Sequence, residues 1–520
     1  MNSPAIQNGG HEPRALRRIW LSLPFVFLLW RGLNTPLLLY DFWWHLKLGE
    51  LILATRSIPS VDLFSFTAEG TPFIAQSWLA EIMIYVIYSS AGLPGLVVLA
   101  TMILLLTLFV IHSIAARSVS DARVLAVADL FAVVALMLCS NLRTQLASFL
   151  FFAVVYLALE EFRAGRWKKL LIVPPVMALW VNIHGAFVLG LALFGFYVIF
   201  ESVWPREGRR RRVAVKGAML LAASTFATLA NPWGWRIYEY VAEVSGSAAI
   251  RAYAIEWQPP RIDELEMIIA VFAPAALVIL LMFLSRRRPS AVEILLVAGF
   301  LAFALLSRRN AIWFSLIAAP IVARQLGAME WVKSLGAGTR APSPAFRRAL
   351  NGAIVVVLAV LSILFTPWVY PRLGIDAVGR SILDRKTPVK AIDFIEEKKL
   401  TGRMFHPQLY GDYIIWRLWP QQKTFIDGRI HLFPIEVADG YVRAMNGIEW
   451  EELFRQWQIR YVLLSRDEPD SQILIDEIET SARWTRIYSD ERSLLFAASP
   501  DDGARFVDPA RPKTTATPSR

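Results

Sequence analysis

Residues 93–115 read LPGLVVLATMILLLTLFVIHSIA and contain no Lys, Arg, Asp or Glu. A run of about 17–25 apolar residues is long enough to cross a bilayer as a helix. The whole chain shares this character, since 56% of its 520 residues are hydrophobic and only 19% are charged. This composition excludes a soluble enzyme, a disordered chain and a small disulfide-rich scaffold. It predicts a polytopic α-helical membrane protein.

Similar apolar runs lie on both sides of this stretch, at 19–39, 124–142, 145–163, 169–185, 186–204, 217–233, 267–284, 291–307, 310–326 and 350–369. Basic segments separate alternate pairs of them: RAGRWKK, REGRRRRVAVK, SRRRPS and the stretch from Val332 to Arg348. Segments rich in Lys and Arg stay in the cytoplasm. Placing all four inside predicts about eleven transmembrane helices within 19–369, with residues 1–18 inside and the C-terminus outside.

This topology makes residues 40–92 the first outer loop. The segment from Trp78 to Tyr88 is apolar enough to span, but a span there would put RRRR outside, so we interpret it as an interfacial helix. DFWWHLKLGELILATR, residues 41–56, has an apolar face interrupted by polar residues, as an amphipathic helix on a membrane surface does.

The composition changes after about residue 369, where charged helical patterns alternate with short β-type runs. The predicted strands are Arg403–Phe405, Lys423–Ile426, Tyr461–Ser465, Trp484–Tyr488 and Ser493–Ala497, and the predicted helices are Pro388–Lys399, Trp450–Trp457 and Ser471–Ser481. This alternation predicts an extracytoplasmic α/β domain over 370–499. The tail at 500–520, rich in Pro, Thr, Asp and Arg, is expected to be disordered.

Polar residues gather at the predicted outer ends of the helices, where a charge close to hydrocarbon usually has a partner or a function. They are Asp41, His45, Asp62, Glu81, Arg143, Gln145, Asn182, His184, Asn231, Glu256, Arg308 and Arg309. The net charge of +11 comes from the basic cytoplasmic segments, which indicates contact with membrane lipids and not with nucleic acid. The single cysteine, Cys139, excludes a disulfide framework.

The chain resembles bacterial multi-pass proteins of the GT-C glycosyltransferase superfamily. The motifs that carry this resemblance are DFWWHLKLGELILATRSIPSVDLFSFTAEG with QSWLAE, LWVNIHGAFVLG, NPWGW, SRRNAIWF, and YGDYIIWRLWP with KTFIDGR. The resemblance implies transfer of a sugar from a polyprenyl-phosphate donor to a glycan, lipid or protein acceptor at the outer face of a bacterial inner membrane. It also implies an acidic catalytic residue after the first span, which Asp41 matches. Many members have an Asp-Glu pair there, whereas Phe42 follows Asp41 in this chain, so Asp62 is a rival for the same role.

These residue types suit an inverting sugar transfer. A carboxylate can accept the proton of the acceptor hydroxyl, and Arg143, Arg308 and Arg309 can hold the lipid phosphate. Adjacent residues on a helix point in different directions, so only one of Arg308 and Arg309 is expected at the site. The other predicted substrate-binding residues are Trp44, His45, Glu81, His184 and Glu256, and Trp43 is expected to help shape the acceptor site. No dissolved nucleotide is needed for this transfer, and Asp41, Asp62 and His45 could hold a divalent metal.

Structural roles are the alternatives. Asp41 could cap a helix, Asp62 could stabilise a turn, and His184 could bond a neighbouring loop at a helix end. Asp427 and Arg429 could form a local ion pair or overhang the membrane site. For the whole chain the alternatives are a flippase for lipid-linked sugars and a non-catalytic scaffold that binds polysaccharide. A flippase would need a polar path through the membrane, and Asp129 and Glu293, the main intramembrane acids, are both predicted near inner helix ends.

Overall fold

The computed structural model describes residues 14–39, 41–139, 141–204, 212–330, 344–364, 366–369, 372 and 382–499. The expected tail at 500–520 and most of the basic segments 206–216 and 332–348 lie outside these residues. The chain divides into two compact units. The first contains Met1–Leu38, Leu48–Ile58 and Ile74–Asp384, and the second contains Leu39–Lys47, Pro59–Phe73 and Arg385–Arg520. Two segments of the expected first outer loop therefore fold with the C-terminal region.

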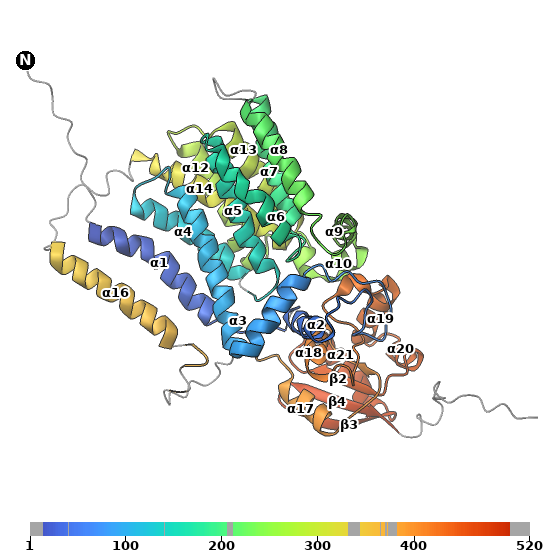
Figure 1. Ribbon diagram of the computed structural model, residues 1–520. Helices are drawn as coiled ribbons and strands as arrows, with labels where there is room; N and C mark the ends of the chain where they lie inside the picture. Colours follow the sequence, from blue (N-terminus) through green and yellow to red (C-terminus); the bar gives the residue numbers. More distant parts are fainter. Residues whose placement is uncertain are drawn as a thin grey trace, which may run out of the picture. The chain divides into compact units, whose positions relative to one another are not determined.

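The first unit is built from helices (Figure 1). They are α1 (Arg14–Leu33), α3 (Trp78–Ala115), α4 (Ala122–Leu138), α5 (Gln145–Arg163), α6 (Val173–Trp180), α7 (Phe187–Val203), α8 (Arg212–Ala227), α9 (Arg236–Gly246), α10 (Ala248–Tyr253), α11 (Leu265–Met267), α12 (Ala273–Leu284), α13 (Ala291–Leu306), α14 (Ala311–Gly327) and α16 (Pro344–Leu364). Each apolar run found in the sequence coincides with a helix in this list.

The length and composition of three described helical stretches suit a membrane span: Trp78–Ala115, Gln145–Arg163 and Leu265–Leu284. Shorter apolar helices cover Phe187–Val203, Ala214–Ala227, Ala291–Leu306 and Ala349–Leu364. In α3 the backbone leaves helical geometry at Gly92, with φ 62° and ψ −162°. This kink separates the expected interfacial segment from the expected span.

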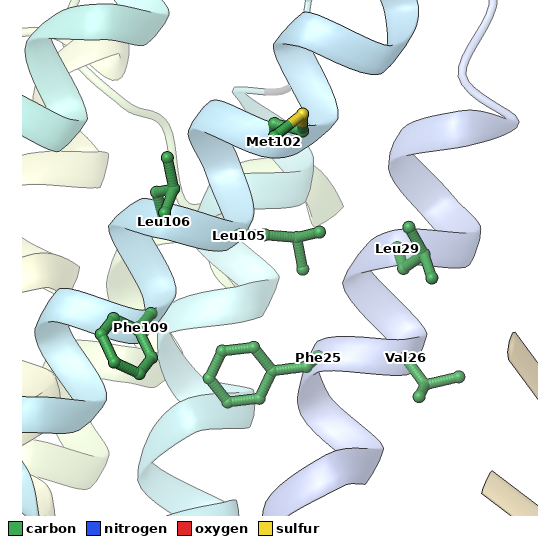
Figure 2. A pocket seen from close by; sticks show the side chains of 7 residues that line it. All are labelled: Phe25, Val26, Leu29, Met102, Leu105, Leu106 and Phe109. Atoms are coloured by element: carbon green, nitrogen blue, oxygen red, sulfur yellow. The ribbon is translucent and has the colours of Figure 1, made fainter. Parts of the chain in front are cut away.

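Helix α14 is the centre of the first unit, since every residue from Ala311 to Gln325 is buried. It packs against α3, α4, α12 and α13. Apolar residues occupy nearly every face of this helix, as expected for a helix enclosed by others. At the periphery, α1 lies beside α16 and α3. An open pocket between α1 and α3 is lined only by apolar side chains, which Figure 2 shows.

The boundary between the units falls inside α2 (Phe42–Thr55). Residues Phe42 to Leu46 are all buried. The beginning of this helix is therefore enclosed by protein and differs from the amphipathic surface helix that the sequence suggested.

The second unit contains a four-stranded sheet in the order β1-β2-β4-β3. The strands are β1 (Met404–Phe405), β2 (Tyr461–Ser465), β3 (Trp484–Ser489) and β4 (Ser493–Ala498), and the helices are α17 (Val389–Glu397), α18 (Gln408–Leu418), α19 (Ile435–Met445), α20 (Trp450–Gln456) and α21 (Pro469–Thr480). β1 pairs with β2 in parallel, and the other pairs are antiparallel. This is the expected α/β domain.

One predicted strand, Lys423–Ile426, is wrong. Thr424 forms a single bridge to Ser65 and does not join the sheet. The bridge is closed by hydrogen bonds from the Thr424 N–H to the Phe64 carbonyl (2.9 Å) and from the Phe66 N–H to the Thr424 carbonyl (3.1 Å). The ladder stops there because Ser65 belongs to a turn. The β-type pattern of KTFI thus reflects burial beside the first-loop segment.

Candidate active site

A buried arginine between two carboxylates organises the second unit. Arg429 Nη1 lies 2.5 Å from Asp62 Oδ1, and Arg429 Nη2 lies 2.6 Å from Asp427 Oδ2. All three side chains are completely buried. Asp427 also accepts bonds from the Arg429 main-chain N–H and from Nε, both at 2.9 Å. The local Asp427–Arg429 ion pair considered from the sequence is therefore present, and Asp62 completes it.

The turn that follows Asp62 supplies several hydrogen bonds to its carboxylate. It accepts hydrogen bonds from the Phe64 N–H (3.2 Å), the Ser65 N–H (3.1 Å) and the Ser65 hydroxyl (2.5 Å). These are the bonds of an Asx turn, which short polar side chains form with the backbone that follows them. With Arg429 as a fourth partner, Asp62 has the geometry of a structural residue, and a role as proton acceptor would require these bonds to break.

Aromatic rings surround the Arg429 guanidinium. Its carbon lies 5.0 Å from the ring centre of Phe64, 5.7 Å from that of Phe73 and 5.9 Å from that of Trp44. Cations are attracted to aromatic faces at such distances. The first-loop segments thus bind Arg429 through both an ion pair and an aromatic cage.

A second pair of carboxylates, Asp41 and Asp412, meets at Gly428. A Cβ atom placed on Gly428 would lie 2.5 Å from Asp41 Oδ1 and 2.7 Å from Asp412 Oδ2. Only glycine leaves room for both oxygens. Gly411 plays a similar part, because its Cβ would lie 2.4 Å from the Ile426 carbonyl oxygen. Helix α18 can therefore press against the 426–427 backbone and bring Asp412 to this point.

The two members of this pair differ in exposure. Asp412 is 2% exposed and accepts a hydrogen bond from the Gly428 N–H at 2.8 Å. Asp41 is only half-buried. It precedes α2, and its carbonyl oxygen accepts the His45 N–H at 3.3 Å, which places it at the N-cap position. Asp41 is thus the carboxylate of the pair that an incoming molecule can reach.

The surroundings shift the pKa values of the buried Asp412 and Asp427 carboxyl groups in opposite directions. Burial raises the pKa of Asp412 well above its usual value, and the negative charges of Asp41 and Asp427 raise it further. Burial also acts to raise the pKa of Asp427, but the adjacent Arg429 guanidinium outweighs it, so this pKa is lowered. Asp427 is therefore ionised, while Asp412 favours its protonated form.

Trp44 and His45, which the sequence predicted for substrate binding, pack close to this group. The rings of Trp44 and His45 are 3.6 Å apart, and both side chains are buried. Trp43 contacts Tyr413 at 5.0 Å between ring centres. Lys47 Nζ lies 5.2 Å from the ring centre of Trp416. These contacts hold the start of α2 against α18.

A separate cluster in the first unit contains two of the predicted arginines. Glu256 Oε2 lies 2.5 Å from Arg143 Nη1, and Glu256 Oε1 lies 3.5 Å from Arg309 Nη1. Arg309 also donates to Gln145 Oε1 at 3.3 Å and stacks on Trp257 at 4.4 Å. Burial acts to raise the pKa of Glu256, but the two arginines outweigh it and lower this pKa. The group keeps one positive charge in excess.

Arg308 turns to a different partner. Its Nη1 lies 2.5 Å from Glu264 Oε2, and its Nη2 lies 2.8 Å from Glu264 Oε1. The adjacent arginines thus point in different directions, and Arg309 is the one that joins Arg143.

Two further residues predicted for substrate binding, His184 and Glu81, lie in the first unit. His184 Nδ1 accepts the Ala186 N–H at 3.1 Å, which is a local bond at the start of α7. Glu81 is fully buried in the first turn of α3. Among the described residues, no group of three His, Cys, Asp or Glu side chains could hold a metal ion.

Asp412 and Gly428 are absent from the sequence-based candidates. The Gly-Asp step in YGDY and the Asp-Gly step in IDGR carry a signal, because a glycine beside an acidic residue allows close backbone approach. Their spatial convergence with Asp41 depends on pairing between segments far apart in the chain, which no local pattern reveals.

Comparisons with known proteins address the fold. No protein-family model matches the chain, and no curated protein matches its sequence significantly. The apo structure of ArnT from Cupriavidus metallidurans matches with a TM-score of 0.52 at 15% identity, covering 93% of this chain and 98% of that one.

Two other solved structures match with lower scores. ArnT from the same organism bound to undecaprenyl phosphate gives a TM-score of 0.47 at 12% identity, over 92% and 98% of the two chains. The apo oligosaccharyltransferase of Archaeoglobus fulgidus gives 0.48 at 13%, over 86% of this chain and 68% of the other. The likeness to apo ArnT extends over nearly the whole of both chains and shows that this chain has the same fold as ArnT, in line with the GT-C-like architecture expected from the sequence.

Proposed function

We propose that this chain is a membrane glycosyltransferase that moves a sugar from a polyprenyl-phosphate carrier to an acceptor hydroxyl at the extracytoplasmic face. The observation that carries the proposal is the reachable Asp41 carboxylate, held after the first helix of a GT-C fold beside a second, buried carboxyl group. ArnT, whose apo form shares the fold, has also been solved with undecaprenyl phosphate bound. That ligand suggests the class of carrier.

The proposed chemistry assigns one role to each cluster. Asp41 accepts the proton of the acceptor hydroxyl while the hydroxyl oxygen attacks C1 of the sugar. The bond from C1 to the carrier oxygen breaks, and its electron pair leaves with the lipid phosphate. Arg143 and Arg309 bind that phosphate, since guanidinium groups match phosphate oxygens in charge and geometry. Glu256 orients both arginines before the carrier arrives.

The two adjacent arginines offer a matched test of carrier binding. The full chain would be extracted gently from its own membrane, and the co-purified lipid identified by native mass spectrometry. Arg309→Ala should weaken retention of a polyprenyl-phosphate sugar at least about tenfold, because it removes a charge-assisted contact. Arg308→Ala should leave retention unchanged, because this arginine pairs with Glu264.

Transfer itself is tested with Asp41→Asn. This variant should bind the carrier as the wild type does but transfer sugar at least about a hundredfold more slowly, as expected when a general base is lost. If only bulk phospholipid co-purifies and added polyprenyl-phosphate sugars bind no better, the glycosyltransferase proposal fails. A non-catalytic scaffold would then be the better description.

A further inference from the structure

We infer that Asp412 is a positioning residue that keeps its proton and donates it as a hydrogen bond to the Asp41 carboxylate. The inference rests on the proposed function, because it assigns Asp412 a role in preparing the proposed base. It starts from the asymmetry of the two carboxyl groups at Gly428, of which one is buried and one half-buried.

The contacts of Asp412 leave one of its oxygens for this role. Oδ1 accepts the Gly428 N–H at 2.8 Å. Oδ2 lies 2.7 Å from the point where a Gly428 Cβ would be, and Asp41 Oδ1 lies 2.5 Å from the same point. Two ionised carboxylates so close together repel each other, and a proton shared between them replaces that repulsion with a hydrogen bond.

The surrounding charges decide which carboxyl keeps the proton. Among the described residues, Asp41, Asp427 and Arg429 are the charged groups with the largest effect on Asp412. The positive charge of Arg429 is already matched by Asp62 and Asp427. Burial and the two neighbouring acids therefore raise the pKa of Asp412. The half-buried Asp41 is better solvated and takes the ionised form, which a base requires.

This pairing has a consequence for catalysis. A hydrogen bond from a neutral donor stabilises the ionised form of Asp41. It also fixes the direction of the carboxylate that faces the acceptor. Asn at position 412 can supply a similar N–H donor, whereas Ala cannot.

The experiment compares Asp412→Asn and Asp412→Ala with the wild type in lipid nanodiscs. Asp412→Asn should keep kcat/KM within about threefold and leave the acidic limb of the pH profile in place. Asp412→Ala should lose at least about tenfold in kcat with little change in KM for the carrier. Its acidic limb should move to higher pH. Asp470→Asn, at an exposed position of the same unit, is the control.

An infrared difference spectrum gives a readout that does not depend on activity. At neutral pH the wild type should show a protonated-carboxyl band that Asp412→Asn lacks and Asp470→Asn retains. If that band is absent from the difference, or if Asp412→Asn is as impaired as Asp412→Ala while folded, the inference is overturned. If the band is present but the wild type transfers no sugar, the proton assignment stands and the proposed function fails.

Discussion

Replacing Arg429 by Met would remove the positive charge that Asp62 and Asp427 share. Met has a similar length and fills much of the same space, so the change isolates the charge. Both carboxylates would stay fully buried in the second unit, with no other described Lys or Arg paired to them. We expect this substitution to unfold or loosen the second unit at neutral pH.

The expected size follows from the burial of the group. Removing one partner of a buried ion pair costs about 3–5 kcal/mol, because the remaining charge is left without compensation. Arg429 serves two carboxylates, so the loss should lie at the upper end of that range. A whole domain is usually stable by only about 5–15 kcal/mol. Arg417→Met is the matched control, since Arg417 pairs with Asp393 and Glu396 at a partly exposed position. Such surface pairs contribute about 0–1 kcal/mol.

Urea-dependent proteolysis of the full chain in nanodiscs would measure the opening of the second unit. The difference between wild type and Arg429→Met should shrink as the pH falls. In the wild type the pKa of Asp427 is lowered, so its contribution is present above the unfolded pKa and is lost as the pH falls through the folded pKa. In the variant, protonation of the buried Asp427 carboxylate at low pH removes its uncompensated charge and so reduces the destabilisation.

A triple variant with Asp62→Asn, Asp427→Asn and Arg429→Met tests the charge argument directly. It should recover much of the lost stability, since no unpaired charge remains. If the triple variant is as unstable as Arg429→Met alone at all pH values, the loss comes from the aromatic cage around Arg429 and the ion-pair reasoning is refuted.

Two further predictions follow from the same unit. Gly428→Ala should leave the protein folded but lower sugar transfer at least about tenfold, because the new Cβ would displace Asp41 and Asp412; Gly440→Ala, whose Cβ meets only the end of Leu453, should transfer normally. Equal rates for both variants would contradict the geometry. Burial lowers the pKa of His406 to about 4. Between about pH 6.5 and pH 4 the unfolded chain therefore binds a proton at His406 that the folded chain does not, so the stability of the second unit should fall as the pH drops through this range. His406→Gln should reduce this decline in pH-dependent proteolysis, and an unchanged slope would show that His406 is not its source.

The sequence predicted most described helices of the first unit because they coincide with continuous apolar runs, and such runs need no tertiary information. It did not predict α9 and α10, which lie between two of these runs. The strands β1 to β4 were also predicted from local β-type patterns. Lys423–Ile426 has the same kind of pattern but pairs only once, with Ser65. Helix α18 was not predicted, since YGDYIIWRLWP mixes aromatic and β-branched residues that favour strands.

The candidate site was predicted in part. The sequence singled out Asp41 and Asp62 but could not distinguish them, because each is an acid in a first-loop segment with turn or cap signals. The difference is set by partners far away in the chain: Arg429 neutralises Asp62, and Gly428 admits Asp412 beside Asp41. Likewise, no local pattern shows that Arg309 turns to Glu256 while Arg308 turns to Glu264.

Two pairs of acidic residues lie near Gly428, Asp62 with Asp427 and Asp41 with Asp412, and their charges are stabilised in different ways. Asp62 and Asp427 are ionised structural groups, and a buried guanidinium stabilises their charge and joins the first-loop segments to the C-terminal region. For Asp41 and Asp412 we infer instead that a proton on Asp412 removes the repulsion between the two carboxylates. Because Arg429 is already matched by two carboxylates, it cannot also neutralise Asp412. Arg429 stabilises the fold but leaves the charge of Asp412 uncompensated, which favours the protonated form of Asp412. A protonated Asp412 can donate a hydrogen bond to Asp41, the proposed base.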